Sequence, residues 1–293
     1  MEILDAQLHL PSPRRTWPHG DQSLDDLRGE VLVAQLDAAG VDTAVLVGSP
    51  HIAPSSAFEA VVARHPDRFA AVLELDETAP DIAEQVAGLR GTPGVVGLRV
   101  VTAMPPANAH RLRAGAYDRL LTAAERHGVA VSMLATGYLA GVAAVARAHP
   151  ALPLVVDHLG LPQPPYQPVA DPAWGDLGHL LALAEFPTVS VKLSGAPTLS
   201  TADYPYPDVW PHLAAVLDAF GVDRCLWGSD HHRVLGRLPG LAPLPAYPGR
   251  HSYAQALHHL LDRADLSTAD KTALFGGTAR RVLNWPIRPA GRG

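Results

Sequence analysis

The stretch ILDAQLHLPSPRR, residues 3–15, joins a short apolar strand pattern to a polar segment that contains no glycine. A doubly wound open sheet normally carries a glycine-rich phosphate loop directly after its first strand. Because this loop is missing, the open sheet is the less favoured of two architectures. The alternative is a barrel in which the same strand is one of eight.

Further apolar runs of strand length follow along the chain, and segments with helical periodicity separate them. Together they predict strands at 3–9, 43–49, 68–75, 94–101, 129–134, 153–159, 188–194 and 224–230. Strand–helix units of about 25 to 40 residues are typical of a (β/α)8 TIM barrel. We therefore expect a single, distorted TIM-barrel domain over residues 1–293.

Two of the intervening segments carry clear helix signals. Ser267 followed by Asp270 has the spacing of a capping pair and predicts the start of a C-terminal helix. An earlier segment has apolar residues at helical spacing, which predict a helix there: Leu24, Leu27, Val31 and Ala34.

Loop lengths indicate which end of the barrel is functional. Connections that follow helices are short, as at 39–42 and 220–223, whereas those that follow strands are long and rich in proline, as at 159–172 and 231–250. Barrel enzymes keep their active sites on the face formed by the loops that follow strands. We therefore expect the functional residues at the C-terminal ends of the strands.

Composition narrows the class of protein. The net charge of −6 gives no reason to expect a nucleic-acid partner. No apolar run approaches the roughly 20 residues that cross a bilayer, and the N-terminal segment lacks a signal-peptide pattern. The single cysteine, Cys225, excludes an internal disulfide and a cysteine-rich zinc site. We expect a cytoplasmic enzyme with a small-molecule substrate, either a monomer or a homo-oligomer.

Alternation of side chains along the first strand predicts which of them point inward. Asp5, Gln7 and His9 share one face, and Leu4, Ala6 and Leu8 share the other. We expect the apolar face to meet the helices, so that Gln7 and His9 point into the barrel.

Ionisable residues recur at the ends of four more predicted strands. They are Arg99 on the fourth, His158 on the sixth on the same face as Leu154 and Val156, Lys192 on the seventh between inward-pointing Ser190 and Ser194, and Asp230 on the eighth. Burying charge in a barrel mouth without partners costs several kcal/mol. Opposite charges there should therefore compensate one another or orient a polar substrate.

These residues also have structural alternatives. His9 could close its strand by bonding a backbone carbonyl, and residues 157–158 could form a cap. Asp230 could be a helix cap or a loop residue. Arg99 and Lys192 could form structural ion pairs.

Six segments occur in a fixed order along the chain: DAQLHL, GLRV, PLVVDHLG, VSVKLSG, FGVDRCLWGSD and TARRVLNW. In this order they resemble the amidohydrolase-2 branch of the amidohydrolase superfamily. Within it they are most similar to a lactonase-like group that includes 2-pyrone-4,6-dicarboxylate lactonase and sugar-acid lactonases. The resemblance implies a distorted TIM barrel with its active site at the strand C-termini.

The resemblance also raises the question of a metal ion. Members with a metal use an HxH pair on the first strand, a histidine on the fifth and an aspartate on the eighth. This chain has Gln7 in place of the first histidine, no histidine in residues 129–137, and Asp230. We therefore favour a site without metal or other cofactor. The alternative is one divalent ion, Zn or Mn, held by His9, His158 and Asp230.

The resemblance and the inward-pointing residues together predict hydrolysis of a lactone or a similar cyclic ester. The substrate would be small and bear carboxylate or hydroxyl groups. Asp230 would act as the general base that takes a proton from water. His9 and His158, with Gln7, would polarise the carbonyl group and stabilise the oxyanion.

Further residues are expected to bind the substrate beside Gln7. Arg99 would hold a carboxylate or hydroxyl by bidentate contact. Lys192 would assist Arg99 or pair with Asp230 and keep it ionised. His51 and His232 are further candidates, whereas a role for His231 is left open.

Two other classes of function stay open at this point. The first is a metal-dependent amidohydrolase or decarboxylase on the same barrel. The second is a lactone isomerase or a degenerate binding barrel, which the replacement at Gln7 motivates.

Overall fold

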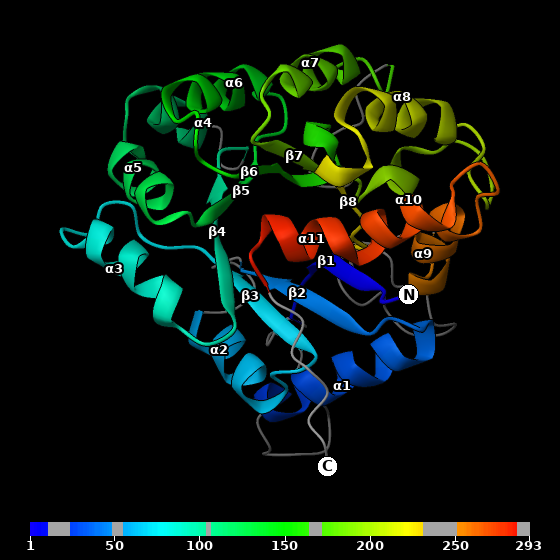
Figure 1. Ribbon diagram of the computed structural model, residues 1–293, viewed down its shortest axis with the longest axis horizontal. Helices are drawn as coiled ribbons and strands as arrows, with labels where there is room; N and C mark the ends of the chain where they lie inside the picture. The colour runs from blue at the N-terminus through cyan, green and yellow to red at the C-terminus, as the bar shows by residue number, and fades with distance from the viewer. Residues whose placement is uncertain (11–23, 49–54, 104–106, 164–171, 231–250, 286–293) are drawn as a thin grey trace.

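The computed structural model describes residues 1–10, 24–48, 55–103, 107–163, 172–230 and 251–285. Within these ranges, eight parallel strands are paired in sequence order and helices surround them (Figure 1). The predicted TIM barrel is therefore confirmed. The strands are β1 (Leu4–Leu8), β2 (Thr43–Val47), β3 (Phe69–Leu73), β4 (Val95–Val101), β5 (Ala130–Leu134), β6 (Leu154–Val156), β7 (Val189–Lys192) and β8 (Cys225–Leu226).

The helices form an outer layer around the strands. They are α1 (Leu24–Ala39), α2 (Ser55–Arg64), α3 (Ile82–Gly88), α4 (Ala107–Arg113), α5 (Asp118–His127), α6 (Leu139–Ala148), α7 (Leu177–Ala182), α8 (Trp210–Phe220), α9 (Tyr253–Leu261), α10 (Thr268–Thr272) and α11 (Thr278–Val282). None of the helices in these ranges is long and apolar enough to cross a membrane.

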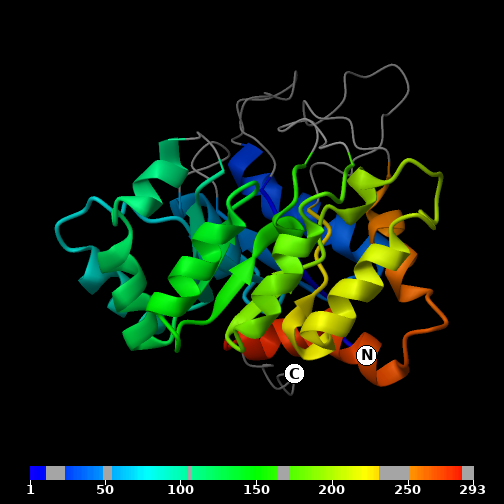
Figure 2. The same ribbon diagram turned by 90° about the horizontal axis from the view of Figure 1, so that it is seen from above.

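The last helices close one end of the barrel. Helix α10 begins at a capping box between Ser267 and Asp270, as their spacing predicts. Helix α11 then lies across the end of the barrel near the N-terminus (Figure 2). There Ala279, Leu283 and Trp285 pack with the inward-facing strand residues. Because this end is plugged, the active site is left to the opposite end of the strands.

The strands are apolar on both faces because each is covered on both sides. Ala44 and Leu46 of β2 pack outward against the helices, whereas Val45 and Val47 belong to the cluster inside the barrel. This two-sided burial explains why the strands appear in the sequence as continuous apolar runs.

Helix α1 forms as its periodicity predicts. Val31 is 46% exposed, and Ala34 is exposed as well. Leu32 and Leu36 are fully buried instead. The described part of the helix therefore buries a second set of apolar residues, Leu32 and Leu36, which are also at helical spacing.

Strand β1 contains one residue more than the stretch of β2 with which it pairs. Asp5 pairs with Ala44, whereas Leu8 pairs with Leu46, so that three steps along β1 match two along β2. Such a β-bulge places consecutive residues on the same face and reverses the alternation beyond it.

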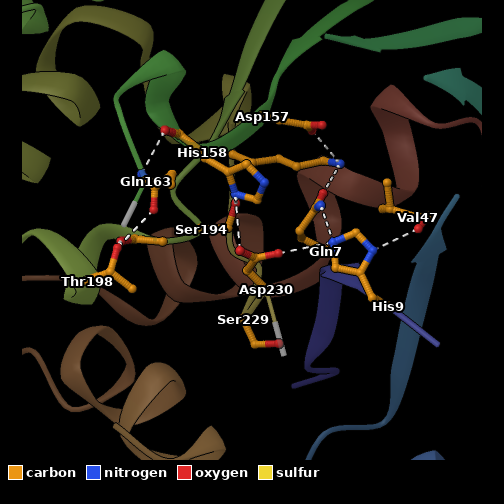
Figure 3. A network of polar contacts seen from close by, with 12 residues as sticks. Gln7, His9, Val47, Asp157, His158, Gln163, Ser194, Thr198, Ser229 and Asp230 are labelled. Carbon is orange, nitrogen blue, oxygen red and sulfur yellow. Dashed lines mark hydrogen bonds and ion pairs between the residues drawn. The ribbon is translucent and has the colours of Figure 1, made fainter. Parts of the chain in front are cut away.

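Because of the bulge, the side chains of β1 do not all lie on the faces that simple alternation predicts. Leu4 and Ala6 lie in the cluster inside the barrel, whereas Leu8 packs outward against the helices. Gln7 and His9 point inward, as expected (Figure 3). Asp5 does not share their face. Its carboxylate accepts a hydrogen bond from Tyr253 of helix α9, on the outer side of the strands.

The barrel closes where β8 meets β1. The backbone N–H of Ala6 donates to Trp227 O at 3.1 Å, and that of Asp230 donates to Gln7 O at 2.8 Å. A Cβ atom at Gly228 would lie 2.7 Å from Gln7 Cβ. Glycine at this position therefore allows the end of β8 to approach the bulge in β1.

Candidate active site

Asp5 connects β1, the segment after β8 and helix α9 through hydrogen bonds. Its carboxylate accepts hydrogen bonds from the backbone N–H groups of Gln7 and Ser229, each at 2.9 Å, and from the hydroxyls of Ser229 and Tyr253. Burial raises the pKa of Asp5, while the bonds from Ser229, Gln7 and Tyr253 act in the opposite direction. This carboxylate therefore fixes the bulge and the segment that carries Asp230.

Asp230 lies at the C-terminal end of β8 and faces two histidines. One of its oxygens, Oδ1, is 3.2 Å from His9 Nε2, and the other, Oδ2, is 3.9 Å from His158 Nδ1 (Figure 3). The Asp230 side chain is 1% exposed. Its φ of 54° lies in the left-handed region, a strained conformation that is often found at functional sites. The predicted meeting of one carboxylate with two imidazoles is present.

His158 reaches this centre by a turn and not by strand alternation. Leu154 and Val156 face outward, so continuing β6 would have carried His158 away from the site. The strand instead ends at Val156, and His158 and Leu159 adopt φ values of 53° and 59°. The predicted face of His158 was wrong, although its place at the centre was right.

Polar contacts brace His158 in this turn. Its Nδ1 lies 2.9 Å from Ser194 Oγ at the end of β7. Gln163 Nε2 donates to His158 O at 3.4 Å, and the Gln163 amide oxygen accepts from Thr198 Oγ1 at 2.9 Å. A Cβ atom at Gly195 would lie 2.2 Å from that amide oxygen, which leaves no room for a side chain there.

A buried ion cluster lies beside the two histidines. Asp157 Oδ2 accepts from Arg99 Nε, and Asp157 Oδ1 lies close to Lys192 Nζ, both at 3.0 Å. Arg99 also donates from Nη1 to Gly48 O at 3.3 Å. Burial alone would raise the pKa of Asp157, but Lys192 and Arg99 outweigh it and hold this pKa well below its usual range. Burial lowers the pKa of Lys192, and Asp157 opposes that effect. We take the pair as charged because each partner favours the ionised form of the other.

Lys192 connects this cluster to Gln7. Its ammonium donates to Gln7 Oε1 at 2.7 Å and to Ser132 Oγ at 3.4 Å, in addition to its contact with Asp157. On the other side, Gln7 Nε2 lies 3.3 Å from His9 Nε2. His9 Nδ1 in turn lies 2.9 Å from Val47 O, a carbonyl that can only accept a hydrogen bond.

Two further histidines are buried beside Tyr206. His251 and His259 each place their rings about 6 Å from Tyr206, with centroid separations of 6.0 and 6.1 Å. Burial lowers the pKa of each to about 4; for His251, His259 adds to the effect and Asp230 opposes it. Neither was predicted from the sequence, because both lie outside the strand ends.

The structure thus brings together Gln7, His9, His158 and Asp230. Arg99 and Lys192 lie next to this group and form ion pairs with Asp157. The structural ion pairs that the sequence leaves open for these two residues are therefore the arrangement observed. The ion pair of Lys192 is with Asp157 and not with Asp230. His51, His231 and His232 lie outside the described residues.

Asp157 is the main residue that the sequence reasoning missed as part of the site. The sequence suggests Asp157 only as part of a cap. A signal was present, because alternation along PLVVDHLG places Val155 and Asp157 on the opposite face from Leu154 and Val156. Val155 indeed lies in the cluster inside the barrel.

The sequence and the fold of the chain are similar to those of known proteins. A family model for amidohydrolases matches residues 5–285. L-fucono-1,5-lactonase of Burkholderia ambifaria is 31% identical over 241 residues, which are 78% of this chain and 79% of the relative. An amidohydrolase structure from Burkholderia multivorans with bound HEPES is 25% identical, with a TM-score of 0.75 over 98% of this chain and 100% of the other.

A putative 2-pyrone-4,6-dicarboxylic acid hydrolase from Pseudomonas putida has the same fold. It is 22% identical, with a TM-score of 0.68 over 98% of this chain and 99% of the other. The matched residues run from the first barrel strand to Trp285, the span of the six sequence segments. The chain belongs to the amidohydrolase family.

Proposed function

We propose that the protein hydrolyses a lactone without a resident metal ion, with Asp230 as the general base. The observation that carries this proposal is the buried Asp230 carboxylate between His9 and His158 at the C-terminal end of β8. The relative at 31% identity, an L-fucono-1,5-lactonase, supports a lactone as the substrate. The substrate is a small ring ester that bears hydroxyl or carboxylate groups.

The reaction consumes one water molecule. As water attacks the lactone carbonyl carbon, its proton passes to Asp230, and the carbonyl electron pair moves to oxygen. Proton transfer of this kind contributes about 10²- to 10⁴-fold to the rate. The tetrahedral intermediate then re-forms the carbonyl and expels the ring oxygen, which takes the proton and becomes the hydroxyl of the product.

His158 and Gln7 stabilise the developing oxyanion in this proposal, and His9, whose Nε2 faces the Gln7 amide nitrogen, helps to hold that amide in place. Fixed donors in a buried site need little reorganisation during the reaction, so each is worth about 10²-fold or more. The bond between His158 Nδ1 and Ser194, and the bond between His9 Nδ1 and Val47, hold both imidazole rings in place.

The donor set does not fit a metal ion at this centre. Gln7 turns its amide oxygen toward Lys192 and its N–H donors toward His9, and N–H donors repel a cation. Strand β5 offers Ser132, which accepts from the same lysine, and no histidine, whereas the resemblance implies a histidine on this strand in members with a metal. Among the described residues, no three His, Cys, Asp or Glu side chains are grouped closely enough to bind an ion.

The first experiment is a panel of sugar-acid and aromatic lactones, with acid release followed by a pH indicator. Ring opening of at least one lactone, with one acid released per turnover, supports the proposal. Absence of acid release with isomerisation of the ring instead would contradict it.

A further inference from the structure

Lys192 sits where its charge can act on the reaction centre only through another residue. Its side chain is 0% exposed and comes from β7, and its ammonium lies between the Asp157 carboxylate and the Gln7 amide. An ammonium has three N–H donors and no acceptor. Three acceptors surround it: Asp157 Oδ1 at 3.0 Å, Gln7 Oε1 at 2.7 Å and Ser132 Oγ at 3.4 Å.

This arrangement determines the direction of the Gln7 amide. Because Lys192 can only donate, the oxygen of Gln7 must face it, and the amide nitrogen must face His9. The opposite orientation would place N–H groups against the ammonium at a buried position. Leaving buried polar groups unsatisfied in this way is unfavourable, and more so next to a charged group.

Asp157 and Arg99 hold Lys192 in position. The carboxylate of Asp157 bridges both cations, and Arg99 is anchored in turn to Gly48 O. These contacts hold the ammonium from the side opposite Gln7. It therefore cannot move with the Gln7 amide if the amide rotates.

We propose that Lys192 is a positioning residue whose ammonium selects the orientation of the Gln7 side chain, so that Gln7 offers N–H donors and not its oxygen to the reaction centre. The proposal rests on the proposed lactone hydrolysis. The sequence suggests that Lys192 binds the substrate directly. In this proposal Lys192 instead acts on the reaction through Gln7. The same contact gives glutamine, instead of histidine, a specific use at this position of β1.

A double-mutant cycle tests whether Lys192 acts through Gln7. Lys192→Met should lower kcat about 10- to 100-fold with little change in KM, because the oriented donor acts on the transition state. In a Gln7→Ala background the same substitution should change kcat less than about 3-fold, because the amide is already gone. An equal loss of kcat in both backgrounds would overturn the proposal, as would an unchanged kcat in Lys192→Met alone.

Two further variants serve if Lys192→Met does not fold. Gln7→Glu keeps an oxygen for the lysine and removes the N–H donors, so it should fold and lose as much kcat as Gln7→Ala. Lys192→Gln keeps an N–H donor and should recover part of the loss. Full kcat in Gln7→Glu would overturn the proposal. Lys271→Met removes the only other lysine of the chain, in α10, and is the matched control.

A second readout does not depend on catalysis. The side-chain NH₂ of Gln7, assigned in ¹⁵N spectra by its loss in Gln7→Ala, should give two separate and exchange-protected N–H signals. In Lys192→Met these signals should shift and lose protection, whereas in Lys271→Met they should not. Unchanged signals in Lys192→Met would overturn the inference, even if no lactone of the panel is hydrolysed and the proposed function itself fails.

Discussion

Asp157 and Lys192 lie 3.0 Å apart, carboxylate oxygen to ammonium nitrogen, at the C-terminal ends of the neighbouring strands β6 and β7, and neither side chain is exposed. Arg99 bonds to the other carboxylate oxygen. Asp157→Asn would leave two buried cations without a counter-charge. We expect the free energy of unfolding to fall by about 3 to 5 kcal/mol in urea denaturation.

An exposed ion pair provides the control for this variant. Arg147 and Glu185 are 3.2 Å apart, but their side chains are 64% and 60% exposed. Glu185→Gln should change the free energy of unfolding by less than about 1 kcal/mol. Equal effects of the two substitutions would mean that burial of the Asp157 cluster has no energetic consequence.

Asp5 should affect catalysis although it faces away from the reaction centre. Its carboxylate holds both the bulge before Gln7 and the segment before Asp230. Asp5→Asn places an NH₂ group among donors, so it should lower both kcat and stability, the latter by about 1 to 3 kcal/mol. Tyr253→Phe removes one of the bonds and should cost about 1 kcal/mol with kcat largely kept. A stable Asp5→Asn enzyme with full kcat would show that the bulge forms without this carboxylate.

Acid should destabilise the protein through the buried histidines. The pKa of His251 and of His259 is about 4 in the folded protein, against an ordinary value of 6.5. Between these values the unfolded chain binds more protons than the folded one, so stability falls as the pH drops from 6.5 toward 4. At pH 5 the loss is on the order of 2 kcal/mol per histidine.

Replacing one of these histidines isolates its share of the pH effect. His259→Leu removes a buried ring whose pKa is lowered to about 4 by burial. The variant should lose less stability than the parent protein between pH 7 and pH 5, as measured by urea denaturation at each pH. Parallel pH profiles for the two proteins would contradict the lowered pKa of His259.

Metal removal should leave the activity intact. The amide nitrogen of Gln7 faces His9, and Lys192 lies directly behind it. We expect less than about 0.1 equivalents of zinc or manganese per chain by elemental analysis, and unchanged kcat after dialysis against a chelator. One equivalent of metal together with loss of activity on chelation would favour the metal-dependent alternative.

The barrel could be predicted from the sequence because its strands are buried on both faces. Continuous apolar runs mark all eight strands, and each observed strand lies inside its predicted range. The position of the site followed as well, because polar residues such as His9 and Asp230 end runs that are otherwise apolar. These features depend on local composition, which the sequence shows directly.

Three features of the site could not be predicted, because they depend on contacts between distant residues. The bulge in β1 depends on bonds from Asp5 to Ser229 and Tyr253, more than 200 residues away. The left-handed turn at His158 breaks the alternation of β6. Lys192 pairs with Asp157 because two inward-facing side chains of neighbouring strands meet, and the mistaken face of His158 concealed that geometry.

The most direct test is the rate of lactone hydrolysis by Asp230→Asn, measured on the best substrate of the panel. Asparagine keeps the shape of the side chain but cannot take up the proton from water. We expect kcat to fall by about 10²- to 10⁴-fold, with an unchanged circular dichroism spectrum and thermal midpoint. A correctly folded Asp230→Asn enzyme with near-normal kcat would contradict a carboxylate base at the end of β8.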